Sequence, residues 1–210
     1  MDTQRTVNLY LDLETWAGNA KPTLDTIEAP ANYTDPIKIQ AYKEKNLDKA
    51  WRKQALDSMK GEIICLCFAI NDGDVVSLTG TEKDILTQFD EVIGEYPWCI
   101  LIGHNILRFD LPWLFHRGIK FGLKGLKSII PHAKNDTAMV RDTLNIFAGI
   151  AFGSDSWYSL SELANFLGIP DKEFNGSEIH DLYLAGNINK IVEHCSYDVS
   201  LVRTIYKMTQ

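Results

Sequence analysis

The segment from Val7 to Glu14 constrains the fold most, because its apolar and polar residues alternate without a break. A period of two is that of a β-strand with one face in a core. Val7 and three leucines form the apolar face, whereas the other face ends on two carboxylates, Asp12 and Glu14. We therefore expect both carboxylates on the same side of a sheet, at the end of one strand.

The remaining patterns predict an α/β domain. Further strands are expected at 62–70, 75–79 and 98–103, and helices at 37–58, 83–95, 110–117, 136–147, 160–167, 176–184 and 188–208. Ser159 and Glu162 form a capping-box pattern at the start of one helix. Hairpins followed by strand–helix alternation indicate a mixed sheet of about five strands flanked by helices.

The 210 residues are expected to form a single domain, 1–210, with an insertion at about 17–58 after the first strand. The insertion begins with a proline-containing irregular stretch and continues as a helix rich in lysine. It either closes over a substrate or shields an edge of the sheet.

Charge limits the mode of nucleic-acid binding. A net charge of −7 argues against a protein that coats DNA electrostatically. Residues 111–135 are a local exception, with no acidic residue and five basic ones: Arg117, Lys120, Lys124, Lys127 and Lys134. This stretch is either a solvated face or a surface that steers a phosphate backbone.

The cysteines and the hydropathy point to a cytoplasmic protein. No run approaches the roughly 18 apolar residues of a membrane span, and the polar N-terminus has no signal core. Cys65, Cys67, Cys99 and Cys195 lie in apolar runs, as reduced, buried thiols do. Cys65-x-Cys67 and His194-Cys195 leave a zinc site as an alternative, but no Cys-x-x-Cys pair supports it.

Four acidic residues on separate elements suggest one metal site. Asp12 and Glu14 end a strand, Asp110 begins a predicted helix, and Asp198 lies within another. Taken singly, each has a plainer explanation as a solvated or helix-terminal charge. Together they offer the oxygen ligands that hard cations prefer. Two such ions about 3.5–4 Å apart would serve phosphodiester hydrolysis.

These motifs resemble the DEDD superfamily of 3′–5′ exonucleases, which has a ribonuclease H-like fold. The branch most similar to the chain is that of the family B DNA polymerase proofreading domains, with stand-alone phage enzymes. The resemblance rests on Leu11–Thr15, Asn105–Asp110 and the region from Tyr158 to Val199. It implies that Asp12, Glu14, Asp110 and Asp198 hold two divalent ions, Mg²⁺ or Mn²⁺, and that Thr15 and Asn105 contact the substrate.

One position departs from this branch, which usually has Tyr four residues before the last Asp. Here that position is His194, which shares a helix face with Asp198 at a spacing of i, i+4. We expect neutral His194 to accept a proton from the attacking water or to orient it. Trp16 either stacks on the terminal base or packs in the core.

The resemblance implies a metal-dependent exonuclease that releases nucleoside 5′-monophosphates from DNA 3′ ends, single-stranded or frayed. RNA remains an alternative substrate. A DNA polymerase or a replication protein is a candidate partner. The expected location is the cytoplasm, that of the host if a phage encodes the chain. The main alternative is a nucleic-acid-binding accessory or proofreading-like module with weak or no cleavage. A serine hydrolase lacks support, since no Gly-x-Ser-x-Gly occurs.

Overall fold

The alternating segment becomes β1 (Asn8–Trp16), the central strand of a five-stranded sheet with the order β3-β2-β1-β4-β5. The computed structural model describes residues 7–128, 139–148, 157–170 and 176–210. β1 pairs antiparallel with β2 (Glu62–Ile70) and parallel with β4 (Ile100–Gly103). The outer strands are β3 (Val76–Thr79) and β5 (Val140–Asp142). The predicted mixed sheet is thus confirmed.

The fifth strand falls inside a predicted helix. The helix expected at 136–147 is wrong in its first part, because β5 occupies 140–142 and α5 (Thr143–Ala148) begins directly after it. Residues 136–138 lie outside the described residues. Three residues are too few to show a strand period, and β5 gains its backbone hydrogen bonds from parallel pairing with β4.

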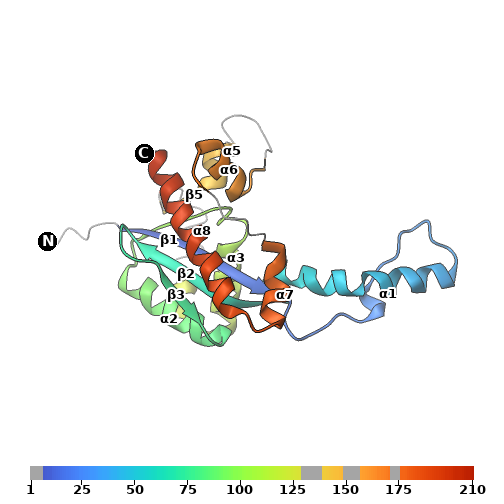
Figure 1. Ribbon diagram of the computed structural model, residues 1–210. Coiled ribbons are helices and arrows are strands. Elements are labelled where there is room, and N and C mark those ends of the chain that lie inside the picture. Colours follow the sequence, from blue (N-terminus) through green and yellow to red (C-terminus); the bar gives the residue numbers. More distant parts are fainter. Residues whose placement is uncertain (1–6, 129–138, 149–156, 171–175) are drawn as a thin grey trace.

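Helices cover both faces of the sheet (Figure 1). One face packs against α2 (Glu82–Glu95) and α3 (Asp110–Phe121), with Leu9, Leu11 and Leu13 in the shared core. The other face packs against α7 (Ile179–Leu184) and α8 (Ile188–Met208). Because side chains alternate along β1, Asp12 and Glu14 lie on the α8 face.

The starts of α2 and α3 lie within one residue of the predicted starts, but α3 is longer than predicted. α2 begins after the cap Thr81, and α3 continues to Phe121, four residues beyond the predicted end. The capping box of α6 (Leu160–Leu167) is confirmed, since the Ser159 hydroxyl accepts from the Glu162 N–H and the Glu162 carboxylate accepts from the Ser159 N–H. None of the described helices is both long and apolar enough to cross a bilayer.

The segment after β1 contains the short helix η1 (Leu24–Thr26), α1 (Pro36–Lys53) and the short helix η2 (Gln54–Leu56). α1 extends away from the body of the domain (Figure 1), and Trp51 is its one buried residue. The Trp51 indole donates to the Gly18 carbonyl and meets Trp16 edge-on. The insertion is therefore anchored at the C-terminal end of α1. A further short helix, η4 (Gly176–Glu178), precedes α7.

Candidate metal centre

β1 brings Asp12 and Glu14 to the centre of the sheet. The pairing register with β2 shifts between Glu14 and Thr15, as at a β-bulge. Bulges bend a strand and redirect its side chains, and they are frequent beside active sites. The strand thus ends its regular pairing directly after the two carboxylates. Both are only partly exposed, and the Glu14 side chain retains 14% of its accessible surface.

α8 presents His194 and Asp198 to these carboxylates. His194 Nε2 lies 3.4 Å from Glu14 Oε1 and 3.6 Å from Asp198 Oδ2. The adjoining side of the same helix is apolar, with Cys195 and Val199 fully buried. Cys195 also donates its thiol to the Asp12 carbonyl, with Sγ and O 3.3 Å apart. One helix therefore fixes its functional and core side chains together.

Asp110 enters the site from the first turn of α3, as predicted. Its exposed fraction is only 2%. Within the described part of the chain, Asp110 Oδ1 is buried and has no hydrogen-bond partner. Burial of an unpartnered carboxylate oxygen is unfavourable, so this atom needs either a proton or a cation.

Asp142, at the end of β5, holds the loop that leads to Asp110. Its carboxylate accepts hydrogen bonds from the backbone N–H groups of Asn105, Leu107 and Leu144, at 2.9, 3.2 and 3.0 Å. Asn105 has a positive φ of 57°, a conformation that needs such support. The sequence analysis missed this residue. An acidic residue directly before a helix start could have indicated this role. Asp142 was not recognised as such because the segment 136–147 was predicted to be helical throughout.

Burial and neighbouring negative charges raise the pKa values of both carboxylates of β1. Burial raises the pKa of Asp12, and the charges of Glu14, Asp198 and Asp110 raise it further. Burial and the charges of Asp198 and Asp110 do the same for Glu14. Burial raises the pKa of Asp110 to about 8. The charges of Asp110 and Asp198 thus reach both carboxylates of β1.

The ligand atoms are spread rather than clustered. Among the described residues, no three of these carboxylate and histidine groups have ligand atoms within 4.8 Å of one another. All four acids offer hard oxygen donors, and Asp110 has an unsatisfied buried oxygen. This donor set fits Mg²⁺ or Mn²⁺.

The structure separates the predicted substrate-side residues. Asn105 stays close to the centre, and its side-chain Oδ1 is buried without a hydrogen-bond partner in the described ranges. Thr15 is buried and donates its hydroxyl to the Ala55 carbonyl. Trp16 packs against Trp51 and Tyr183, with 5% of its surface exposed. Trp16 therefore packs in the core, and its stacking on a terminal base stays a prediction.

The basic stretch after Asp110 is not an open cationic surface throughout. The Arg117 guanidinium is buried and pairs with Glu82, with Nε and Oε1 3.1 Å apart. Lys120 pairs with the same carboxylate at 3.2 Å. Lys124 and Lys127 are exposed beyond the end of α3, and Lys134 lies outside the described residues. Arg117 is thus not available to steer a phosphate backbone, whereas the Lys120 side chain remains 49% exposed.

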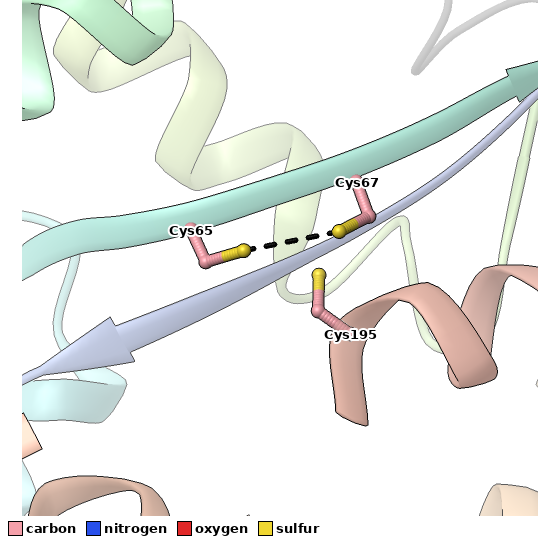
Figure 2. Close-up of side chains that lie close together, drawn as sticks. All are labelled: Cys65, Cys67 and Cys195. Atoms are coloured by element: carbon pink, nitrogen blue, oxygen red, sulfur yellow. Dashed lines mark hydrogen bonds between the residues drawn. The ribbon is translucent and has the colours of Figure 1, made fainter. Parts of the chain in front are cut away.

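Three of the four buried, reduced cysteines gather between β2 and α8 (Figure 2). The Sγ atoms of Cys65 and Cys67 are 3.8 Å apart, and all three sulfurs, including that of Cys195, lie within 4.8 Å of one another. Structural zinc is normally held by four ligands. No fourth Cys, His, Asp or Glu joins this group in the described ranges, and His194 faces the carboxylates instead. The cluster is best explained as packed thiols.

A cavity of about 540 Å³ adjoins the carboxylates. Glu14, Thr15 and Phe109 line one side of it, and Lys49, Arg52 and Lys53 of α1 line another. Residues from η4 and α7, including Gly176 and His180, complete the lining. The insertion therefore contributes directly to the space next to the site.

The sheet and its helices define an exonuclease-like α/β domain of the kind found in family B DNA polymerases. The family B DNA polymerase from the hyperthermophilic archaeon Pyrobaculum calidifontis aligns with 97% of this chain and 24% of its own, at a TM-score of 0.59 and 14% identity. Such low identity establishes the fold alone.

The chain belongs to the family described as a predicted 3′-5′ exonuclease related to the exonuclease domain of PolB, whose model matches residues 62–208. It is 34% identical over 77 residues to the DNA polymerase delta catalytic subunit of Arabidopsis thaliana, covering 37% of this chain and 7% of that protein. It is also 34% identical over 64 residues to a DNA polymerase of Archaeoglobus fulgidus, covering 30% and 8%. The matched region is thus less than a tenth of either polymerase.

Proposed function

We propose that this domain hydrolyses the terminal phosphodiester bond at the 3′ end of single-stranded or frayed DNA and releases nucleoside 5′-monophosphates. The convergence of Asp12, Glu14, Asp110 and Asp198 from β1, α3 and α8 carries this proposal. Family membership supports the exonuclease class. We also propose a polymerase or another replication protein as its partner.

The four acids would hold two divalent ions, Mg²⁺ or Mn²⁺. When bound, such ions neutralise charge on the scissile phosphate and make water a stronger nucleophile. The chain's own contribution is a rigid frame. Asp12 and Glu14 are fixed by the central strand, Asp198 by a helix packed on that strand, and Asp110 by the loop that Asp142 holds.

His194 is proposed as the proton acceptor for the attacking water. Its Nε2 lies between Glu14 and Asp198, so water entering between these carboxylates meets the ring edge. A neutral imidazole nitrogen accepts a proton, and hydrogen bonding to it also fixes the direction of a water lone pair. His194 would thereby replace the tyrosine usual at this position. Asn105 Oδ1 is the proposed acceptor for a donor group of the terminal nucleotide.

A time course on labelled oligonucleotides tests the function. Single-stranded DNA and RNA 20-mers, labelled at either end, are incubated with Mg²⁺ or Mn²⁺, with and without EDTA. We expect 3′ label to leave as mononucleotide, 5′-labelled DNA to shorten stepwise, and EDTA to stop both. Asp198→Asn serves as the inactive control, and Glu91→Gln, on the exposed side of α2, as the matched active one.

Other outcomes of that time course have a definite meaning. Binding of DNA without product after hours in Mn²⁺ would support the accessory-module alternative and contradict cleavage. Loss of the 5′ label as mononucleotide would contradict the polarity. Faster cleavage of RNA than of DNA would correct the substrate while leaving the chemistry intact.

A further inference from the structure

The charge of α1 is opposite to that of the whole protein. The chain has a net charge of −7, and the four acids of the centre repel any phosphate that approaches without a cation. In α1, by contrast, six basic residues accompany two acidic ones, Glu44 and Asp48, which gives the helix a charge of +4. A nucleic acid must therefore be attracted by local surfaces, and α1 is such a surface.

Four of these basic residues lie on one side of the helix. At 100° per residue, Lys38, Lys45, Lys49 and Lys53 fall within an arc of about 80°. We call these four residues the basic stripe. It runs for about 22 Å along α1. Lys43 lies about 120° from Lys49 and is outside the stripe.

The lysines of the stripe are available to a ligand. All four are exposed. Throughout the described ranges no hydrogen bond or ion pair engages their ammonium groups, although Arg52 on the same helix pairs with Asp48 and Asp181. The Arg52 contact of 2.8 Å to Asp181 links α1 to α7. Arg52 therefore holds the helix in place, while the stripe keeps its charge unneutralised.

The stripe leads to the metal centre. Its last two members, Lys49 and Lys53, line the same cavity as Glu14 and Thr15. The helix is also fixed at this end, because Trp51 is buried against Trp16 and bonded to Gly18. A strand whose 3′ end reaches Glu14 can thus continue through the cavity and along α1.

We propose that α1 binds the phosphodiester backbone of the single strand, upstream of the 3′-terminal nucleotide, along Lys38, Lys45, Lys49 and Lys53. This proposal rests on the proposed exonuclease function, which places the 3′ end at Glu14. It assigns a role to a segment that lies outside the family match at 62–208. The contacts are to phosphate, so they carry no base preference.

The test compares Lys49→Gln/Lys53→Gln with a matched pair, Lys43→Gln/Lys83→Gln, in the full chain. Lys83 is exposed on α2, on the other side of the sheet. Both pairs remove two charges and keep good helix formers. Circular dichroism verifies folding. Affinity for a fluorescent 20-nucleotide oligothymidine is measured by anisotropy in EDTA, between 50 and 200 mM salt, so that cleavage does not interfere.

We expect the stripe pair to raise the Kd about 25-fold at 0.1 M salt, about fivefold for each lost phosphate contact. The slope of log Kd against log salt should fall by about 1.4. The matched pair should change the Kd less than twofold. Equal effects of the two pairs would overturn the proposal. So would equally strong competition by a polyglutamate of equal charge, because α1 would then be a general anion-binding surface.

Cleavage in Mg²⁺ separates this proposal from the function on which it rests. If the unsubstituted protein cleaves and the stripe pair binds and cleaves like the matched pair, α1 is not the binding surface and the nuclease proposal stands. If the unsubstituted protein binds through the stripe but never cleaves, the nuclease proposal fails. With both correct, the ratio of kcat/KM for a 20-mer to that for a trinucleotide falls in the stripe pair. An RNA 20-mer should bind through the same lysines.

Discussion

The acidic centre and the basic helix α1 meet at one cavity but are built in opposite ways. The centre takes its residues from the middle of the sheet and from helices packed on both faces. α1 extends from the body and buries only Trp51. Fixed geometry suits groups that must act on one bond. An exposed arm suits a backbone that is recognised by charge alone. Substitutions are thus expected to alter catalysis and substrate binding separately.

The largest expected effect tests the acidic side of this comparison. Asp198→Asn should lower kcat about 10³-fold, because it removes charge that stabilises the transition state through the bound ions. The Kd for oligothymidine in EDTA should stay the same or fall, since a repelling charge is lost. Steady-state cleavage and anisotropy measure the two quantities. A variant with the kcat of the parent would show that Asp198 takes no part in the reaction.

A smaller loss is expected at His194. Removal of a proton acceptor in His194→Ala should lower kcat about 10²-fold. His194→Tyr should recover part of that loss, because tyrosine is usual at this position in the resembled branch. Both are compared with the parent at matched Mg²⁺. If both variants cleave like the parent, His194 is a bystander.

Asp142 tests whether the loop depends on its buried carboxylate. Asp142→Asn loses charge-assisted hydrogen bonds to three backbone N–H groups, and the free energy of unfolding should fall by about 3 kcal/mol. The thermal midpoint should fall by roughly 9 °C. Asp74→Asn, in an exposed turn, is the control and should shift it by less than about 2 °C. An unchanged midpoint in Asp142→Asn would mean that the loop keeps its conformation without the Asp142 carboxylate.

The pH dependence of the thermal midpoint in the metal-free protein tests the raised pKa of Asp110. The Asp110 pKa is raised from 3.8 to about 8, so the folded protein keeps a proton that the unfolded chain releases. The stability that this provides is complete below about pH 4 and is lost as the pH rises through 8. In EDTA the midpoint should fall by roughly 8 °C between pH 6 and 9, since the two pH units between 6 and a pKa of about 8 correspond to about 2.7 kcal/mol. Asp110→Asn should flatten this slope, and Mn²⁺ should remove it.

The smallest expected effect concerns the thiol cluster. Purified, untagged protein should contain less than about 0.1 zinc per chain, since three sulfurs without a fourth ligand are a poor structural zinc site. Elemental analysis measures this directly. A stoichiometric content that disappears in Cys65→Ser but persists in Cys99→Ser would identify a zinc site beside the acidic centre.

Regular periodicity made much of this molecule predictable. β1 alternates over eight residues and α8 is long and amphipathic, so the elements that carry Asp12, Glu14, His194 and Asp198 could be placed from sequence. Asp110 was located because its helix start carries a motif of the resembled family. These positions depend on local patterns, and local patterns are visible in one sequence.

What could not be predicted depends on contacts between distant segments. β5 is three residues long and exists through pairing with β4. Asp142 is important because it faces the backbone of residues 105 and 107, more than 30 positions earlier. Arg117 looked solvated in a basic stretch, yet it is buried against Glu82. Such pairings have no periodic signature, so only the folded chain reveals them.

The central position of β1 has a consequence for partial unfolding. Both of its edges are hydrogen-bonded, to β2 and to β4, and both of its faces are covered. Amide protons at residues 9 and 10, where β1 pairs with both neighbours, should therefore exchange with solvent only when the whole domain opens. Those of α1 should exchange far sooner. Local fluctuations of the periphery would then leave Asp12 and Glu14, two of the proposed ion ligands, in place for the next strand.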